Sequence, residues 1–143
     1  MTINHVGLCL RDLDRSRRFY EALGFEEALD MAVPDDPMHR LVQLEKPVGL
    51  RAVYLTLGSF VLELLHFAEQ APPAREARVM NEVGLTHLSI GVEDLAAARA
   101  TVDDNGGEVL ADTDVGVAVM VRDPDGQLVE LLDNRYRPVP PPA

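Results

Sequence analysis

Alternating apolar and polar residues predict that most of the chain forms short strands, with glycine or proline marking the turns. Two segments instead have apolar residues at helical spacing, begin after an aspartate suited to capping a helix and end at glycine. The predicted helices cover 13–23 and 95–105, and a short helix is also compatible with 74–81. The predicted strands are 2–10, 25–33, 40–45, 50–57, 60–67, 85–92, 108–110, 116–121 and 127–132, with a loop at 34–37.

This pattern occurs twice along the chain. A strand histidine, a capping aspartate, an apolar leucine and a helix-ending glycine recur at one offset of 82 residues. The pairs are His5/His87, Asp12/Asp94, Leu13/Leu95 and Gly24/Gly106. A repeat of this length predicts a duplicated structural unit. We therefore predict one domain built from a βαβββ module at 1–67, a linker at 68–84, a second βαβββ module at 85–134 and a proline-rich tail at 135–143.

The last predicted hairpin contains a carboxylate in an otherwise apolar strand. Residues 123–126, Asp-Pro-Asp-Gly, suit a tight turn, because proline presets one turn position and glycine accepts a left-handed one. In the strand that follows, Glu130 shares a face with Leu128 and Leu132. A carboxylate there is costly unless something compensates its charge, and a metal ion is one such compensation. Glu63 follows the Gly58 turn of the first module in the same way.

Two histidines in the first strands and two glutamates in the last strands form a candidate metal site. On a curved sheet these strands can converge, which would place His5, Glu63, His87 and Glu130 on one concave surface. Two imidazoles and two carboxylates suit a divalent metal such as Ni, Co, Zn, Mn or Fe(II). An octahedral shell would keep positions open for water or substrate, which permits Lewis-acid chemistry. A single histidine in a strand is more often a core residue. Two histidines and two glutamates at symmetric positions of a repeated module favour metal binding instead.

Composition narrows the classes of function. The 143 residues are enough for one domain, and the formal net charge of −11 argues against non-specific nucleic-acid binding. No apolar run approaches the roughly 20 residues that span a bilayer. The lack of a signal-peptide pattern and the single cysteine, Cys9, predict a cytoplasmic protein without an internal disulfide. We therefore expect a small-molecule partner, and neither a nucleic acid nor a membrane.

The chain resembles the vicinal oxygen chelate superfamily, the group of glyoxalases, bleomycin-resistance proteins and extradiol dioxygenases, from Ile3 to Asp133. The motifs that carry the resemblance are His5-Val6-Gly7, Asp12-Leu13, Phe19-Tyr20, Leu23-Gly24-Phe25, Thr86-His87-Leu88, Glu93-Asp94-Leu95, Asp123-Pro124-Asp125-Gly126 and Glu130-Leu131. It implies an α+β fold of two tandem βαβββ modules that form a cup-shaped, curved mixed sheet around a metal. It also implies that His5, Glu63, His87 and Glu130 are the metal ligands. Family members usually dimerise, so a homodimer is expected, with the site inside one chain or shared between two.

The His-Glu-His-Glu set is similar to that of bacterial glyoxalase I. This resemblance implies a metal-dependent lyase or isomerase that transfers a proton at a carbon next to a metal-chelated oxygen. Glu130 is the favoured base and Glu63 is the other candidate.

Two other classes of the same superfamily are alternatives, and a third is disfavoured. Methylmalonyl-CoA epimerase is the first, because Glu63-Leu64-Leu65-His66 and the long linker to Gly84-Leu85-Thr86-His87 resemble that enzyme, and Glu45 lies near the position of its extra base. A non-catalytic drug-binding protein of the bleomycin-resistance type is an alternative of another class. Extradiol dioxygenases are disfavoured, because their second histidine would fall at Glu63.

Overall fold

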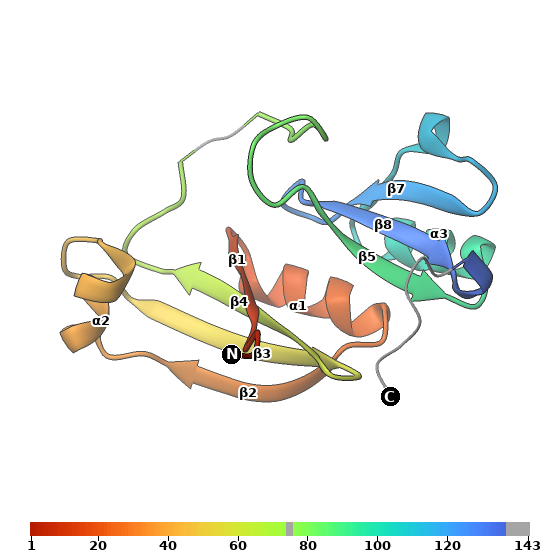
Figure 1. Ribbon diagram of the computed structural model, residues 1–143. Coiled ribbons are helices and arrows are strands. Elements are labelled where there is room, and N and C mark those ends of the chain that lie inside the picture. Colours follow the sequence, from red (N-terminus) through yellow and green to blue (C-terminus); the bar gives the residue numbers. More distant parts are fainter. Residues whose placement is uncertain (74–75, 137–143) are drawn as a thin grey trace. The chain divides into compact units, whose positions relative to one another are not determined.

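The computed structural model describes residues 1–73 and 76–136. The chain divides into two compact units, Met1–Arg75 and Glu76–Ala143. Each unit contains one four-stranded mixed sheet with helices (Figure 1). The predicted α+β fold of two tandem modules is therefore confirmed. None of the helices in the described ranges is both long and apolar enough to cross a membrane.

The first unit brings the start of its module beside the end. Its elements are β1 (Val6–Leu10), α1 (Leu13–Ala22), β2 (Glu26–Ala32), α2 (Asp35–Val42), β3 (Leu50–Leu57) and β4 (Phe60–Phe67). The strand order is β1-β4-β3-β2. β1 runs parallel to β4, while the β2–β3 and β3–β4 pairs are antiparallel. Residues of β1 and β4 that are far apart in sequence can therefore share one face of the sheet.

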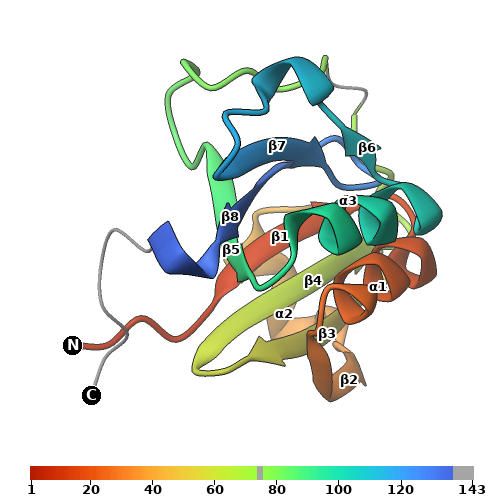
Figure 2. The same ribbon diagram turned by 90° about the vertical axis from the view of Figure 1, so that its right-hand side faces the viewer.

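Helix α1 begins and ends where the sequence predicts. Asp12 caps it, because its Oδ1 accepts a hydrogen bond of 2.9 Å from the backbone N–H of Arg15. Gly24, with φ of 97°, follows the helix end in the left-handed region. The helix packs beside β4 (Figure 2). The apolar positions of this core are buried: Leu13, Phe19 and Tyr20 on the helix, and Val53, Leu55, Leu62 and Leu64 on β3 and β4.

The second unit repeats the topology of the first. Its elements are β5 (His87–Val92), α3 (Leu95–Asp104), β6 (Glu108–Val109), a 3₁₀ turn η1 (Ala111–Thr113), β7 (Ala118–Arg122), β8 (Leu128–Asp133) and a second 3₁₀ turn η2 (Asn134–Tyr136). The strand order is β5-β8-β7-β6, again with a parallel pair between the first and last strands. Asp94 caps α3 as Asp12 caps α1, with 3.0 Å from its Oδ1 to the N–H of Ala97.

The predicted Asp-Pro-Asp-Gly turn joins β7 to β8. The Asp123 side chain is buried in the turn, and its Oδ1 accepts hydrogen bonds from the backbone N–H groups of Asp125 at 2.9 Å and Gln127 at 2.8 Å. Gly126 takes a φ of 87°, which a glycine adopts without strain. The turn sets the register that pairs Met120 with Glu130.

The sequence prediction was wrong between β2 and β3. The predicted strand at 40–45 and the predicted loop at 34–37 are replaced by α2, which begins at Asp35, and by an irregular segment after it (Figure 1). Met38, Leu41 and Val42 also fit helical spacing, and a run of six residues is too short for its pattern to separate helix from strand. Asp35 then holds the following segment, because its carboxylate accepts from the N–H groups of Val48 and Gly49.

The segment that joins the two modules also differs from the prediction. Residues 76–81 contain no helix, although the sequence of 74–81 is compatible with a short one. Residues 74–75 and most of the predicted tail, 137–143, lie outside the described residues.

Candidate functional site

In the first unit, the predicted ligands His5 and Glu63 are in contact. His5 lies immediately before β1 and not inside the strand, whereas Glu63 lies in the middle of β4. Because Gly7 pairs with Glu63 across the parallel strands, His5 is two residues back on the same face. The distance from Nε2 of His5 to Oε2 of Glu63 is 3.0 Å, and the Glu63 side chain is only 13% exposed.

Tyr54 holds the other oxygen of the same carboxylate. It pairs with Glu63 across the antiparallel strands, and its hydroxyl donates a hydrogen bond of 2.5 Å to Oε1. This hydrogen bond, burial and the negative charge of Glu63 raise the pKa of Tyr54 to about 12. The ring of Tyr54 also meets the imidazole of His5 edge-on, with 5.7 Å between centroids. Both oxygens of Glu63 are therefore occupied.

In the second unit, His87 and Glu130 occupy the equivalent positions. His87 is the first residue of β5, and Ser89 pairs with Glu130 across the parallel strands. Nε2 of His87 lies 4.0 Å from Oε2 of Glu130, and the Ser89 hydroxyl donates to that same oxygen at 2.5 Å. Within the described residues, Oε1 of Glu130 has no hydrogen-bond partner.

The preceding residue occupies the second ring nitrogen of each histidine. Nδ1 of His5 lies 2.7 Å from Oδ1 of Asn4, and Nδ1 of His87 lies 2.9 Å from Oγ1 of Thr86. An Nδ1–H that donates to Asn4 leaves the Nε2 lone pair of His5 facing a carboxylate oxygen. In this tautomer two acceptors face each other, an arrangement that either a proton or a bound cation would satisfy.

The chemical types of these side chains fit the ligands of a divalent metal. Imidazole nitrogen and carboxylate oxygen suit the borderline metals, and histidine ligands usually have their other ring nitrogen hydrogen-bonded in this way. Each unit supplies one such pair. Among the described residues, neither unit gathers three or more His, Cys, Asp or Glu side chains that could hold a metal.

The third predicted catalytic residue, Glu45, lies outside the strands of the first unit. It is exposed in the irregular segment after α2. Its backbone oxygen accepts from Nε2 of Gln70 at 3.1 Å, and no described hydrogen bond or ion pair links its carboxylate to another predicted site residue.

The sequence analysis missed Tyr54 and Ser89. Counting back equally from the two-residue turn between β3 and β4 would have placed Tyr54 opposite Glu63. Ser89 is two residues after His87 and therefore shares its face. Both positions could have been found once the hairpin register was applied to the glutamates.

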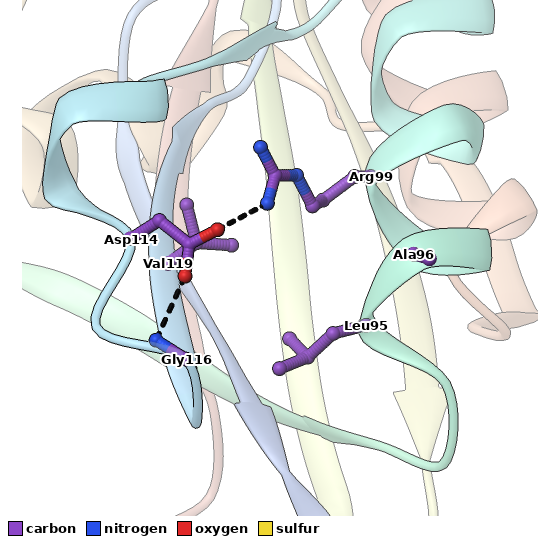
Figure 3. Close-up of a pocket in the computed structure, with 6 residues that line it drawn as sticks. All are labelled: Leu95, Ala96, Arg99, Asp114, Gly116 and Val119. Carbon is purple, nitrogen blue, oxygen red and sulfur yellow. Dashed lines mark hydrogen bonds and ion pairs between the residues drawn. The ribbon is translucent and has the colours of Figure 1, made fainter.

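A pocket lies elsewhere in the second unit, on the helix side of the sheet. It has a volume of about 350 Å³ and is lined by Leu95, Ala96, Arg99, Asp114, Gly116 and Val119 (Figure 3). Arg99 forms an ion pair with Asp114, which also accepts a hydrogen bond of 2.8 Å from the N–H of Gly116. The Gly116 hydrogen bond and then the Arg99 contact lower the pKa of Asp114. None of the predicted site residues lines this pocket.

Comparison with known proteins identifies related sequences. The family model described as the Glyoxalase/Bleomycin resistance protein/Dioxygenase superfamily matches residues 2–131. An ethylmalonyl-CoA/methylmalonyl-CoA epimerase from Cereibacter sphaeroides is 31% identical over 110 residues, which cover 76% of this chain and 73% of the relative.

Solved structures share the fold. A glyoxalase family protein from Bacillus cereus has a TM-score of 0.80 at 18% identity, with 92% of each chain covered. The trypanothione-dependent glyoxalase I of Leishmania major has a TM-score of 0.66 at 27% identity, covering 92% of this chain and 85% of that one.

Proposed function

Because the chain belongs to the Glyoxalase/Bleomycin resistance protein/Dioxygenase superfamily, we propose that it is a metal-dependent isomerase or lyase acting on a small carbonyl or thioester substrate. The reaction is proton transfer at the carbon next to the substrate carbonyl. One observation carries the proposal: each unit pairs an imidazole with a carboxylate at equivalent positions, His5 with Glu63 and His87 with Glu130.

We propose that these four side chains hold one divalent metal ion. When bound, the metal polarises the substrate oxygen and so acidifies the adjacent C–H. Asn4 and Thr86 support this role, because they engage Nδ1 of each histidine and leave Nε2 facing the glutamate.

Glu130 is the proposed base. Its Oε1 is free of hydrogen bonds within the described residues, and its side chain is 28% exposed. A proton acceptor needs an accessible lone pair on oxygen, which Glu130 offers and Glu63 does not. Glu130 would take the proton from the substrate carbon. In an isomerase it would return the proton to the neighbouring carbon, whereas in an epimerase a second acid would protonate the opposite face of the same carbon.

Two substrate classes are favoured by separate observations. Similarity to the ethylmalonyl-CoA/methylmalonyl-CoA epimerase favours an acyl-CoA thioester, which an epimerase would invert at the carbon next to the thioester carbonyl. Similarity to glyoxalase I favours a thiol hemithioacetal of a 2-oxoaldehyde. An epimerase also uses a second acid on the opposite face of the carbon, and Glu45 is the candidate for that role.

The first test measures metal binding and proton exchange in one preparation. Chelator-treated protein should take up about one Ni, Co or Zn ion per site, and His5→Ala and His87→Ala should each weaken uptake. In deuterated buffer, the loaded protein should exchange the C–H next to the carbonyl of a thioester or a hemithioacetal, and Glu130→Gln should abolish exchange. Glu45→Gln should slow exchange of the thioester only.

Failure of both metal uptake and proton exchange would contradict the proposed function. Protein that takes up none of these ions and exchanges neither substrate is not this enzyme. If such protein binds aromatic drugs without metal, it is a drug-binding member of the superfamily.

We also propose a homodimer, which a mixing experiment would test together with the placement of the site. The His5→Ala and Glu130→Gln variants should each be inactive. If sites are shared between two chains, mixing them restores about a quarter of the activity, because mixed dimers then contain one intact site. If each site lies inside one chain, mixing restores none.

A further inference from the structure

The two glutamates receive their hydroxyl partners from opposite neighbouring strands. Glu63 receives Tyr54 from the antiparallel strand β3, whereas Glu130 receives Ser89 from the parallel strand β5. We propose that Tyr54 and Ser89 are positioning residues that give the glutamates different tasks. Tyr54 commits Glu63 to metal binding, and Ser89 orients Glu130 for proton transfer. This inference rests on the proposed function.

Tyr54 leaves Glu63 no oxygen for proton transfer. Its hydroxyl occupies Oε1 at 2.5 Å while His5 contacts Oε2 at 3.0 Å. Rotation of the carboxylate would break one of these contacts inside a site where the side chain is 13% exposed. A phenol on a rigid ring limits that rotation further, since the ring is itself packed edge-on against His5. Glu63 is therefore held as a fixed ligand.

Ser89 has the opposite effect on Glu130. Its hydroxyl donates to Oε2, the same oxygen that His87 approaches at 4.0 Å, so both contacts lie on one side of the carboxylate. The residue facing Glu130 across the antiparallel strands is Met120, whose thioether has no hydrogen to donate. Oε1 thus keeps its lone pairs, while the carboxylate plane is anchored at one oxygen.

The pairing register shows that the two modules differ at both neighbouring positions. Gly7 stands where Ser89 stands in the second module, and Tyr54 stands where Met120 stands. A Cβ at Gly7 would lie 3.6 Å from Oε2 of Glu63 and 3.3 Å from a Leu65 methyl. A serine side chain there would compete with His5 for Oε2. In each module the glutamate therefore accepts from one hydroxyl: Glu63 from Tyr54 on its antiparallel neighbour, and Glu130 from Ser89 on its parallel neighbour.

The test separates metal affinity from turnover. Calorimetric titration with Zn or Co(II), without substrate, should give a metal Kd about 10-fold or more weaker for Tyr54→Phe, and a Kd within about 2-fold of wild type for Ser89→Ala. The Co(II) absorption spectrum should change in Tyr54→Phe and not in Ser89→Ala. Excess metal should restore the proton-exchange rate of Tyr54→Phe towards the wild-type rate. Ser89→Ala should stay about 10-fold or more slower at any metal concentration.

Matched variants control for folding and for loss of a hydroxyl. Tyr136→Phe and Ser59→Ala remove the same groups from exposed positions and should change neither quantity. Ser89→Thr keeps the hydroxyl and should recover most of the exchange rate.

Two results would overturn the inference, and they are distinguishable. If wild-type protein binds no metal, the proposed function fails and this inference fails with it. If wild type binds metal and exchanges protons, but Tyr54→Phe keeps wild-type affinity or Ser89→Ala keeps the wild-type rate, only the division of tasks is wrong.

Discussion

Tyr54 lies directly opposite Glu63 on the neighbouring antiparallel strand and donates a 2.5 Å hydrogen bond to its Oε1. The bond joins two side chains that a turn of two residues brings into register. It makes the pKa of Tyr54 depend on the charge of Glu63, so ionisation of the phenol is a measure of whether that charge is present.

In metal-free protein, Tyr54 should ionise near pH 12 instead of at the ordinary pKa of 10.0, because the adjacent carboxylate disfavours a phenolate. As the pH rises from 10 to 12, the unfolded chain loses the phenol proton while the folded chain keeps it, so the stability that the proton provides is lost in that window. Alkaline titration of tyrosinate absorbance, taken as wild type minus Tyr54→Phe, measures the pKa. Glu63→Gln should lower it, and an unchanged value in that variant would contradict the prediction.

The two capping aspartates should contribute similar stability. Asp12→Ala and Asp94→Ala each remove one side-chain acceptor from a helix N-terminus and should each lower the free energy of unfolding by about 1 kcal/mol. Chemical denaturation followed by circular dichroism measures the loss. Asn at either position keeps an acceptor oxygen, so Asp12→Asn should cost less than Asp12→Ala. Equal losses for the Asn and Ala variants would mean that the cap hydrogen bond is not responsible.

A core substitution in the first unit should be far more damaging than a surface one. Leu64 is fully buried on the helix side of β4, so Leu64→Ala should cost about 2–5 kcal/mol through lost burial and a residual cavity. Leu41 is 75% exposed, and Leu41→Ala should change stability by less than about 0.5 kcal/mol. Thermal or chemical unfolding compares the two. Similar losses would show that β4 does not form the core described above.

The buried carboxylate of Asp133 should make the protein sensitive to acid. Side-chain and backbone hydrogen bonds from Arg135 lower the pKa of Asp133 from 3.8 to about 2. A lowered folded-state pKa provides stability above the unfolded value, and that stability is lost as pH falls from about 4 to about 2. Acid unfolding followed by circular dichroism should therefore be less steep in Asp133→Asn. Arg135→Gln should raise the pKa of Asp133 towards its ordinary value, so that less stability is lost as the pH falls.

Strands 50–57 and 60–67, and both capped helices, could be predicted from sequence because local pattern and turn chemistry agree there. The region 34–45 could not, because proline near a helix start and a six-residue apolar pattern fit helix and strand equally, and the contact from Asp35 to Val48 and Gly49 is non-local.

The same limit applies to the candidate site. The four proposed ligands could be chosen from their symmetric places in the repeat. Their contacts with Tyr54 and Ser89 depend on strand register, which the composition of a single strand does not contain.

Because Asp123 is buried in the turn between β7 and β8, the number of residues in this turn decides which face of the sheet Glu130 occupies. The hydrogen bonds of Asp123 fix how many residues separate β7 from β8, and successive residues of a strand point to opposite faces. Inserting or deleting one residue between Asp123 and Leu128 would turn Glu130 towards the helix side of the sheet and bring Leu131 to the face it now occupies. Such a variant would retain all four proposed ligands and still lose the candidate site. Among natural or engineered relatives, the spacing from this turn is therefore a stricter test of shared chemistry than the presence of the glutamate.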